Sequence, residues 1–84
     1  MQEKEIGTIT HYYGHLGVGI IRLSDVLKVG DTIHIKGHTS DFTQTVDFIQ
    51  IEHEDVSAAK TGDVIGLKVV QKVHPNDKVL RQVA

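Results

Sequence analysis

Apolar and polar residues alternate with a period of two along much of this chain, and this pattern is what most restricts its fold. The segment "DTIHIKG", residues 31–37, is the clearest case, because Ile33 and Ile35 face one way while the residues around them face the other. Such alternation is typical of a strand with one buried and one exposed face. β-Branched residues are abundant, and glycines interrupt almost every window long enough for a helix. The chain is therefore predicted to be all-β.

Segments of this kind predict six strands. They lie at residues 5–13, 17–23, 31–37, 42–56, 63–73 and 77–84. The segment 42–56 changes its apolar side part-way along, which requires a bulge or a tight bend. One helical turn at most is expected, within residues 53–62. Because 84 residues cannot cover both faces of a wide sheet, we expect a small closed six-stranded antiparallel β-barrel.

The chain length also sets the domain organisation and the size of the core. In 84 residues there is room for one domain, residues 1–84, and for no catalytic domain beside it. A domain this short hides only about 60–65% of its unfolded surface, so its core must be continuous. The inward positions of the predicted strands give the expected core residues, which are Ile33, Ile35, Val46, Phe48, Val64, Leu67 and Val69.

Two Gly-Asp pairs stand where predicted strands begin. Residues 30–31 precede "TIHI" and residues 62–63 precede "VIGL". Gly adopts positive φ at a tight turn without steric cost, and Asp bonds the local backbone as the next strand begins. A third turn, "HPNDKVL" at residues 74–80, is expected to work in the same way. A phosphate cradle needs consecutive backbone donors ahead of a helix, so we interpret all three segments as structural turns.

Charge and cysteine content restrict the partners and the compartment. Nine Lys and Arg against eleven Asp and Glu give a formal net charge of −2, so binding to a polyanion would require a local basic patch. The chain has no cysteine, which excludes disulfides and thiolate metal sites and favours a cytoplasmic protein. Residues 1–10 carry charges where a signal peptide is apolar, and no apolar stretch approaches the roughly 20 residues that span a bilayer. We expect no membrane association.

Histidine and serine patterns give little support to an enzyme or a metal site. His11 and His15 are four residues apart, about 13 Å in a straight strand, which is too far for one metal unless a hairpin brings them closer. His34 and His38 have the same spacing. The serines that neighbour an Asp are typical of turns and caps rather than of a nucleophile with its base. We therefore predict no catalytic residues, no bound metal and no cofactor.

Two longer stretches carry a family resemblance. "VLKVGDTIHIKG" followed by "TVDFIQIEHEDVSAAKTGDVIGLKV" resembles the second domain of translational GTPases of the elongation-factor-Tu type, a β-barrel, and the resemblance covers about residues 5–83. The residues that fill the family's pattern are Gly30, Asp31, Ile33, Ile35, Gly37, Ile49 to Glu52, Ala59, Gly62, Asp63, Val64, Gly66 and Leu67. The chain lacks "G-x-x-x-x-G-K-[ST]", so the nucleotide-hydrolysing domain is absent and the barrel would stand alone.

The resemblance implies a non-catalytic binding module that contacts tRNA or other RNA. Barrels of this shape also accompany the catalytic part of collagenase-like peptidases, so the alternative is a protein-interaction or accessory barrel for a separately encoded enzyme of that kind. The near-neutral charge favours the alternative. A monomer is expected in either case.

If the chain binds RNA, the residues expected to do so lie in three of the predicted strands. Tyr12 or Tyr13 would stack on a base, since adjacent strand residues face opposite sides and one tyrosine is expected to point outward. Arg22, His34 and Lys36 would contact phosphates or sugars. A tyrosine that only caps the open end of a small barrel remains the plainer interpretation.

Overall fold

The computed structural model describes residues 2–83, which form ten strands and no helix. The strands are β1 (Gln2–Tyr13), β2 (Val18–Leu23), β3 (Leu27–Lys28), β4 (Thr32–Lys36), β5 (Asp41–Thr45), β6 (Ile49–Ile51), β7 (Glu54–Val56), β8 (Ala58–Ala59), β9 (Val64–Lys68) and β10 (Lys78–Val83). The all-β prediction is confirmed. The helical turn expected within residues 53–62 is wrong, because this segment consists of turns and the short strands β7 and β8.

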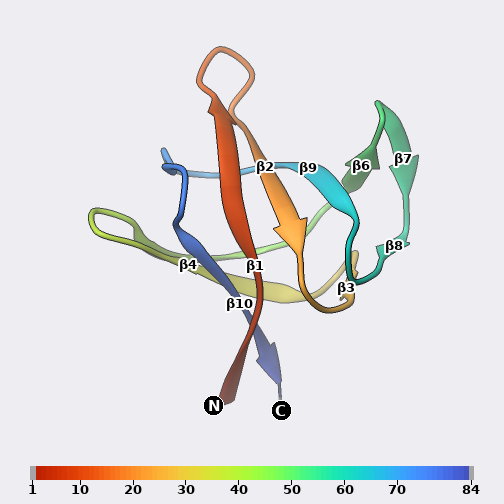
Figure 1. The fold of residues 1–84 in the computed structure, drawn as a ribbon, viewed down its shortest axis with the longest axis horizontal. Coiled ribbons are helices and arrows are strands. Elements are labelled where there is room, and N and C mark those ends of the chain that lie inside the picture. The colour runs from red at the N-terminus through yellow and green to blue at the C-terminus, as the bar shows by residue number, and fades with distance from the viewer. Residues whose placement is uncertain (1, 84) are drawn as a thin grey trace.

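Eight of the strands form one sheet in the order β5-β4-β10-β1-β2-β9-β6-β7, and β3 pairs with β8 in a second, two-stranded sheet. The strand pairs are antiparallel. Figure 1 shows β1 and β10 side by side near the middle of the molecule, with both chain ends at the same side. The turn that joins β1 to β2 protrudes at the opposite side.

The large sheet curls but does not close. Strands β5 and β7 lie at its two ends and are not paired with each other, so the predicted closed six-stranded barrel is wrong in both closure and strand count. The count fails because the segment 42–56 is not one strand. It breaks after β5 and turns between β6 and β7, where Glu52 and His53 adopt positive φ values of 51° and 66°.

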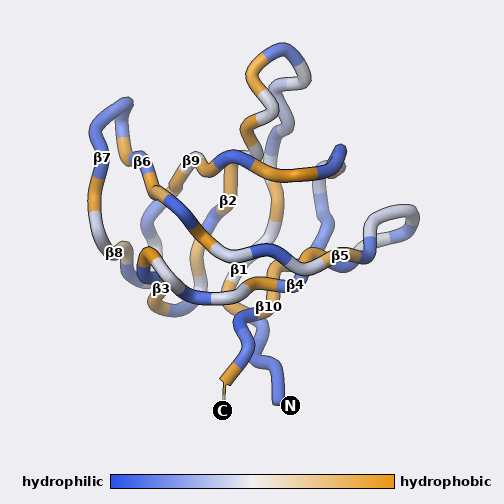
Figure 2. The backbone as a smooth tube through the Cα atoms, turned by 180° about the vertical axis from the view of Figure 1, so that it is seen from behind, coloured by the Kyte–Doolittle hydropathy of each residue, from blue (hydrophilic) through white to orange (hydrophobic). Residues whose placement is uncertain are grey.

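The core is filled mainly by isoleucine, leucine and valine from the inner face of the sheet. Figure 2 shows hydrophobic and hydrophilic stretches alternating in short steps along the strands. Five of the predicted core residues are buried, namely Ile33, Ile35, Val46, Leu67 and Val69. Val64 is instead 50% exposed, and Ile65 takes the inward position because it shares a face of the strand with Leu67 and Val69. Phe48 is only partly buried.

Three turns of the same construction begin strands or lead into them. Gly30 has φ of +98° and Gly62 has φ of +92°, which confirms the positive φ predicted for both glycines. In the first turn the backbone N–H of Lys28 donates to Asp31 Oδ2 at 2.9 Å. In the second turn the N–H of Lys60 donates to Asp63 Oδ2 at 3.0 Å, and in the third the N–H of His74 donates to Asp77 Oδ2 at 2.9 Å.

The third turn replaces glycine with Asn76, whose φ of +76° lies in the same left-handed region. Asn is one of the few residues with a side chain that tolerates this conformation. The prediction that residues 74–80 form a turn of the same type is therefore confirmed.

No helix within residues 2–83 is long and apolar enough to cross a membrane.

Candidate functional site

Arg22 and Lys36, two of the residues predicted to contact phosphates, lie in one line across the outer face of the sheet. Lys36 is opposite Lys78, Lys78 is opposite Thr8, and Thr8 is opposite Arg22. Directly opposed residues of an antiparallel sheet share a face. Three strand spacings separate the ends of this line, about 14 Å. We call Lys36, Lys78 and Arg22 the basic row.

Lys78 was not singled out by the sequence analysis, because only the pairing register of β10 places it between the other two cations. Its Nζ lies 3.5 Å from Glu5 Oε1, so part of its charge is balanced locally. Arg22 and Lys36, at the two ends of the basic row, are exposed. This line of positive charge is local, within a chain whose formal net charge is −2.

Of the two predicted tyrosines, Tyr13 is the one that points outward. Its side chain is 50% exposed and its ring stacks on that of His11, with centroids 6.0 Å apart and an interplanar angle of 16°. Tyr12 packs against the hydrophobic core. His11 was missed as a neighbour of Tyr13, although two residues of one strand separated by a single position share a face.

His34 lies two residues before Lys36 on the same face of β4, between two carboxylates. Its Nδ1 lies 2.9 Å from Glu3 Oε2 and its Nε2 lies 2.5 Å from Asp41 Oδ1, and its side chain is 18% exposed. The hydrogen bonds to Asp41 and then to Glu3 raise the pKa of His34, while partial burial opposes the shift. The two ring nitrogens of His34 thereby link β4 to β1 through Glu3 and to β5 through Asp41.

A metal site requires several ligating side chains that converge on one point. Within residues 2–83, no group of three His, Asp or Glu side chains comes close enough to hold a metal ion. The aspartates at the three turns bond backbone N–H groups instead.

A hollow of about 500 Å³ lies on the outer face where β2, β9 and β6 adjoin. We call it the outer hollow, and its apolar lining residues are Leu16, Val18, Ile20, Ile51 and Val64. Leu16 is 67% exposed and Val64 is 50% exposed, which leaves apolar surface facing solvent. Val64 is paired with Arg22, so the outer hollow adjoins one end of the basic row.

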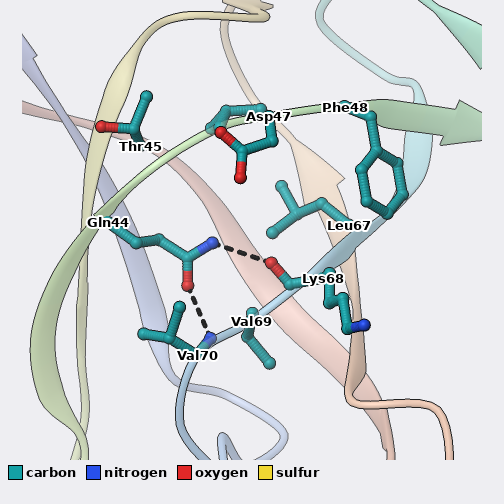
Figure 3. Close-up of a pocket in the computed structure, with 9 residues that line it drawn as sticks. Gln44, Thr45, Asp47, Phe48, Leu67, Lys68, Val69 and Val70 are labelled. Atoms are coloured by element: carbon teal, nitrogen blue, oxygen red, sulfur yellow. Dashed lines mark hydrogen bonds between the residues drawn. The ribbon is translucent and has the colours of Figure 1, made fainter.

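A second cavity, of about 340 Å³, lies between residues 44–48 and residues 67–70. Figure 3 shows the side chain of Gln44 crossing this gap toward the backbone beyond β9. Its Nε2–H donates to the carbonyl oxygen of Lys68 at 2.8 Å, and its Oε1 accepts from the N–H of Val70 at 2.9 Å. We call this gap the seam.

Comparisons with known proteins were made for sequence and for structure. No family model matches the chain. The chain is 40% identical over 76 residues to an uncharacterized protease of Methanocaldococcus jannaschii, covering 89% of this chain and 19% of that protein. It is 35% identical over 82 residues to a collagenase of Porphyromonas gingivalis, covering 95% of this chain and 23% of that protein. The chain thus spans about a fifth of the length of these relatives.

The structure matches the C-terminal domain of a Geobacillus thermoleovorans protein assigned as a U32 peptidase. The TM-score is 0.89 at 19% identity, and the match covers 95% of this chain and 93% of that one. The chain has the fold of that domain. A selenomethionine variant of the same domain matches with a TM-score of 0.88 at 21% identity.

The resemblance to domain 2 of elongation-factor-Tu type GTPases is therefore wrong as an assignment. The relatives and the structural matches are proteases, a collagenase and a U32 peptidase C-terminal domain, and not translation factors. The physical reason lies in the residues that carried the resemblance. The glycines and aspartates at positions 30–31 and 62–63 encode tight turns, and any small antiparallel fold requires such turns.

Proposed function

We propose that this chain is a non-catalytic accessory domain that serves a collagenase-like peptidase. The observation that carries the proposal is coverage: the matches take in 89% and 95% of this chain but only 19% and 23% of the two relatives. The solved structure with the same fold is likewise a C-terminal domain of a larger protein. The remaining four-fifths of such relatives is long enough to hold the catalytic part.

The polar contacts of the domain support a role other than catalysis. His34 braces three strands through Glu3 and Asp41. The three aspartates of the repeated turns bond backbone groups. These titratable side chains hold strands and turns in place.

The outer hollow is the surface that we assign to contact with the peptidase part. It exposes Leu16 and Val64, and large exposed apolar side chains gathered at a concave surface are typical of interaction sites. Arg22, next to Val64, would form the polar rim of this interface.

The proposal is tested by exchanging domains in the Porphyromonas gingivalis collagenase. Its matching segment is deleted in one variant and replaced by this chain in a second, and hydrolysis of labelled gelatin is measured. Deletion is expected to lower kcat/KM at least about tenfold, equal to about 1.4 kcal/mol, and the graft is expected to restore it. The isolated 84-residue chain is expected to release no fragments.

Two variants of the graft test the assigned surface. Val64→Asp in the outer hollow should abolish the restoration, whereas Val29→Asp, at an exposed valine outside the hollow, should leave it intact. Hydrolysis by the isolated chain, or a deletion without effect, would contradict the proposal.

A second candidate function, contact with RNA, is supported by the basic row and by the exposed ring of Tyr13. Three cations would contact about three phosphates, so the logarithm of the binding constant should fall with the logarithm of salt concentration with a slope of about −2. The measurement is a fluorescence titration with single-stranded RNA at several salt concentrations. Equal binding by the Lys36→Ala and parent chains would remove this candidate.

A further inference from the structure

The seam separates β5 from the end of β9 and the two residues that follow it. Strand β5 is the last strand at one end of the large sheet, and residues 67–70 face it across the cavity. Within residues 2–83, no backbone hydrogen bond joins β5 to β9 or to the residues directly after it. Strand β9 pairs with β2 and, at Gly66, with β6, so residues 67–70 extend past the pairing with β6 and face β5 with no backbone ladder across the gap.

Gln44 occupies this gap with the hydrogen-bonding pattern of a strand residue. Its amide donates to the carbonyl of Lys68 and accepts from the N–H of Val70, the two residues that flank Val69. In a parallel ladder, one residue of the added strand makes the same two bonds to the residues on either side of its partner. The side-chain amide of Gln44 thus takes the place of the N–H and C=O groups of one strand residue opposite Val69.

The gap is wider than one strand spacing and narrower than two. An extended glutamine side chain reaches about 5 Å from its Cα to its terminal atoms. The hydrogen bonds add 2.8 and 2.9 Å, which separates the Gln44 Cα from the facing backbone by up to about 8 Å. This separation exceeds the ~4.8 Å of one ladder and approaches the ~9.6 Å of two.

The cavity beside Gln44 can receive a side chain from such a strand. Its volume is about 340 Å³, and a cavity of roughly 150 Å³ in another protein holds a benzene molecule. Val46, Phe48 and Leu67 line it, and Val70 at its rim is 69% exposed. Figure 3 shows Leu67 between the Gln44 amide and the ring of Phe48.

We propose that the seam binds an extended peptide segment, which displaces the Gln44 amide, pairs with the backbone at Lys68–Val70 and places an apolar side chain in the cavity. The occupant is a segment of the polypeptide substrate, and this source rests on the proposed peptidase function. Recognition by backbone pairing is sequence-tolerant, which suits a domain that holds unfolded chains for a protease. The peptide binding itself stands on the geometry of the seam alone.

The test uses the ¹⁵N-labelled 84-residue chain and the peptide Ac-Lys-Thr-Val-Thr-Val-Lys-amide, followed by amide shifts. Shifts are expected at residues 44–48 and 67–70. A peptide of the same sequence with both valines N-methylated lacks the N–H donors of one edge of the strand and is expected to bind at least tenfold more weakly. Equal binding of both peptides, shifts confined to the outer hollow, or no shifts at millimolar peptide would overturn the proposal.

The Gln44→Ala variant distinguishes an amide that competes with a bound peptide from an amide with a purely structural role. Because the amide competes with the peptide, its removal should tighten peptide binding about fivefold, in line with the net value of a hydrogen bond. Phe48→Ser, at a partly exposed position of the cavity wall, should weaken binding, and Val29→Asp, at an exposed valine outside both the seam and the outer hollow, should leave it unchanged. Unchanged affinity in both Gln44→Ala and Phe48→Ser would reject the seam as the site.

The two proposals fail separately. Peptide binding by the isolated chain, together with a graft that does not restore gelatin hydrolysis, would keep the seam as a peptide site and reject the peptidase as its source. A graft that restores hydrolysis without peptide shifts at residues 44–48 would keep the accessory role and reject the seam.

Discussion

At the residue scale, short polar bonds and single glycines hold the turns that aim each strand. The same bond, from a backbone N–H to the carboxylate three residues later, forms in the turns that end at Asp31, Asp63 and Asp77. A left-handed residue precedes each aspartate, namely Gly30, Gly62 or Asn76. The turn chemistry is therefore local, since each turn is specified by four consecutive residues.

Gly30→Val is expected to destabilise the domain through backbone strain. A Cβ at Gly30 would meet no atom within 4 Å, so the cost comes from the φ of +98° and not from a clash. A β-branched residue in this region costs about 1–2 kcal/mol. The free energy of unfolding in urea measures the loss. Gly14→Val in the β1–β2 turn is the matched control, because Gly14 has no positive φ.

The bridge from Glu3 through His34 to Asp41 makes stability depend on pH. The carboxylates raise the pKa of His34 in the folded chain above its ordinary value of about 6.5. The stabilisation is therefore complete below about pH 6.5, and it is lost as pH rises through the higher folded pKa. We expect His34→Gln to lower Tm more at pH 5.5 than at pH 9.

Differential scanning fluorimetry at the two pH values measures this difference. The same substitution at His15, exposed in the β1–β2 turn, is the control. An equal loss of Tm at both pH values would mean that His34 contributes only through packing.

At the element scale, the pairing of β1 with β2 depends on one close approach. A Cβ at Gly7 would lie 2.7 Å from the carbonyl oxygen of Arg22 and 2.8 Å from Ile21 Cγ2. The register of β1 against β10 shifts between Glu5 and Gly7, so this glycine also lies at a bulge. The bulge thereby bends β1 at this position.

Gly7→Ala is expected to destabilise the domain by about 1–3 kcal/mol, because the backbone oxygen of Arg22 cannot move aside as a flexible side chain would. Urea unfolding measures the change. Gly66→Ala in β9 is the control, since its Cβ would lie 3.4 Å from the nearest side-chain atom. A loss no greater than that of the control would show that the β1–β2 contact relaxes without cost.

At the scale of the whole molecule, the two ends of the described chain are paired with each other. Gln2 lies opposite Val83, and β10 separates β1 from β4 in the sheet. Figure 1 shows the N- and C-terminal ends together at one side and the β1–β2 turn at the other. The pairing of β1 with β10, next to the middle of the sheet, is therefore the one that is most distant in sequence.

A circular permutant that joins the ends through a short Gly-Ser linker and opens at residues 14–15 is expected to keep the fold. The cut falls in an exposed turn, and the pairing of β1 with β10 becomes local, which should raise the folding rate. Dispersed amide resonances and stopped-flow refolding measure both expectations. A permutant opened between Ile20 and Ile21, inside β2, should not fold.

The sequence determined the features that depend on a few neighbouring residues. The β class follows from period-two alternation, and the turns at 30–31, 62–63 and 74–77 follow from the φ preferences of Gly and Asn. Tertiary structure alone decided what depends on register between distant strands. It left the sheet open, turned Val64 outward, placed Lys78 between Lys36 and Arg22, and set Gln44 against the backbone that flanks Val69. A shift of one residue exchanges the two faces of a strand, and only packing against the rest of the sheet selects between them.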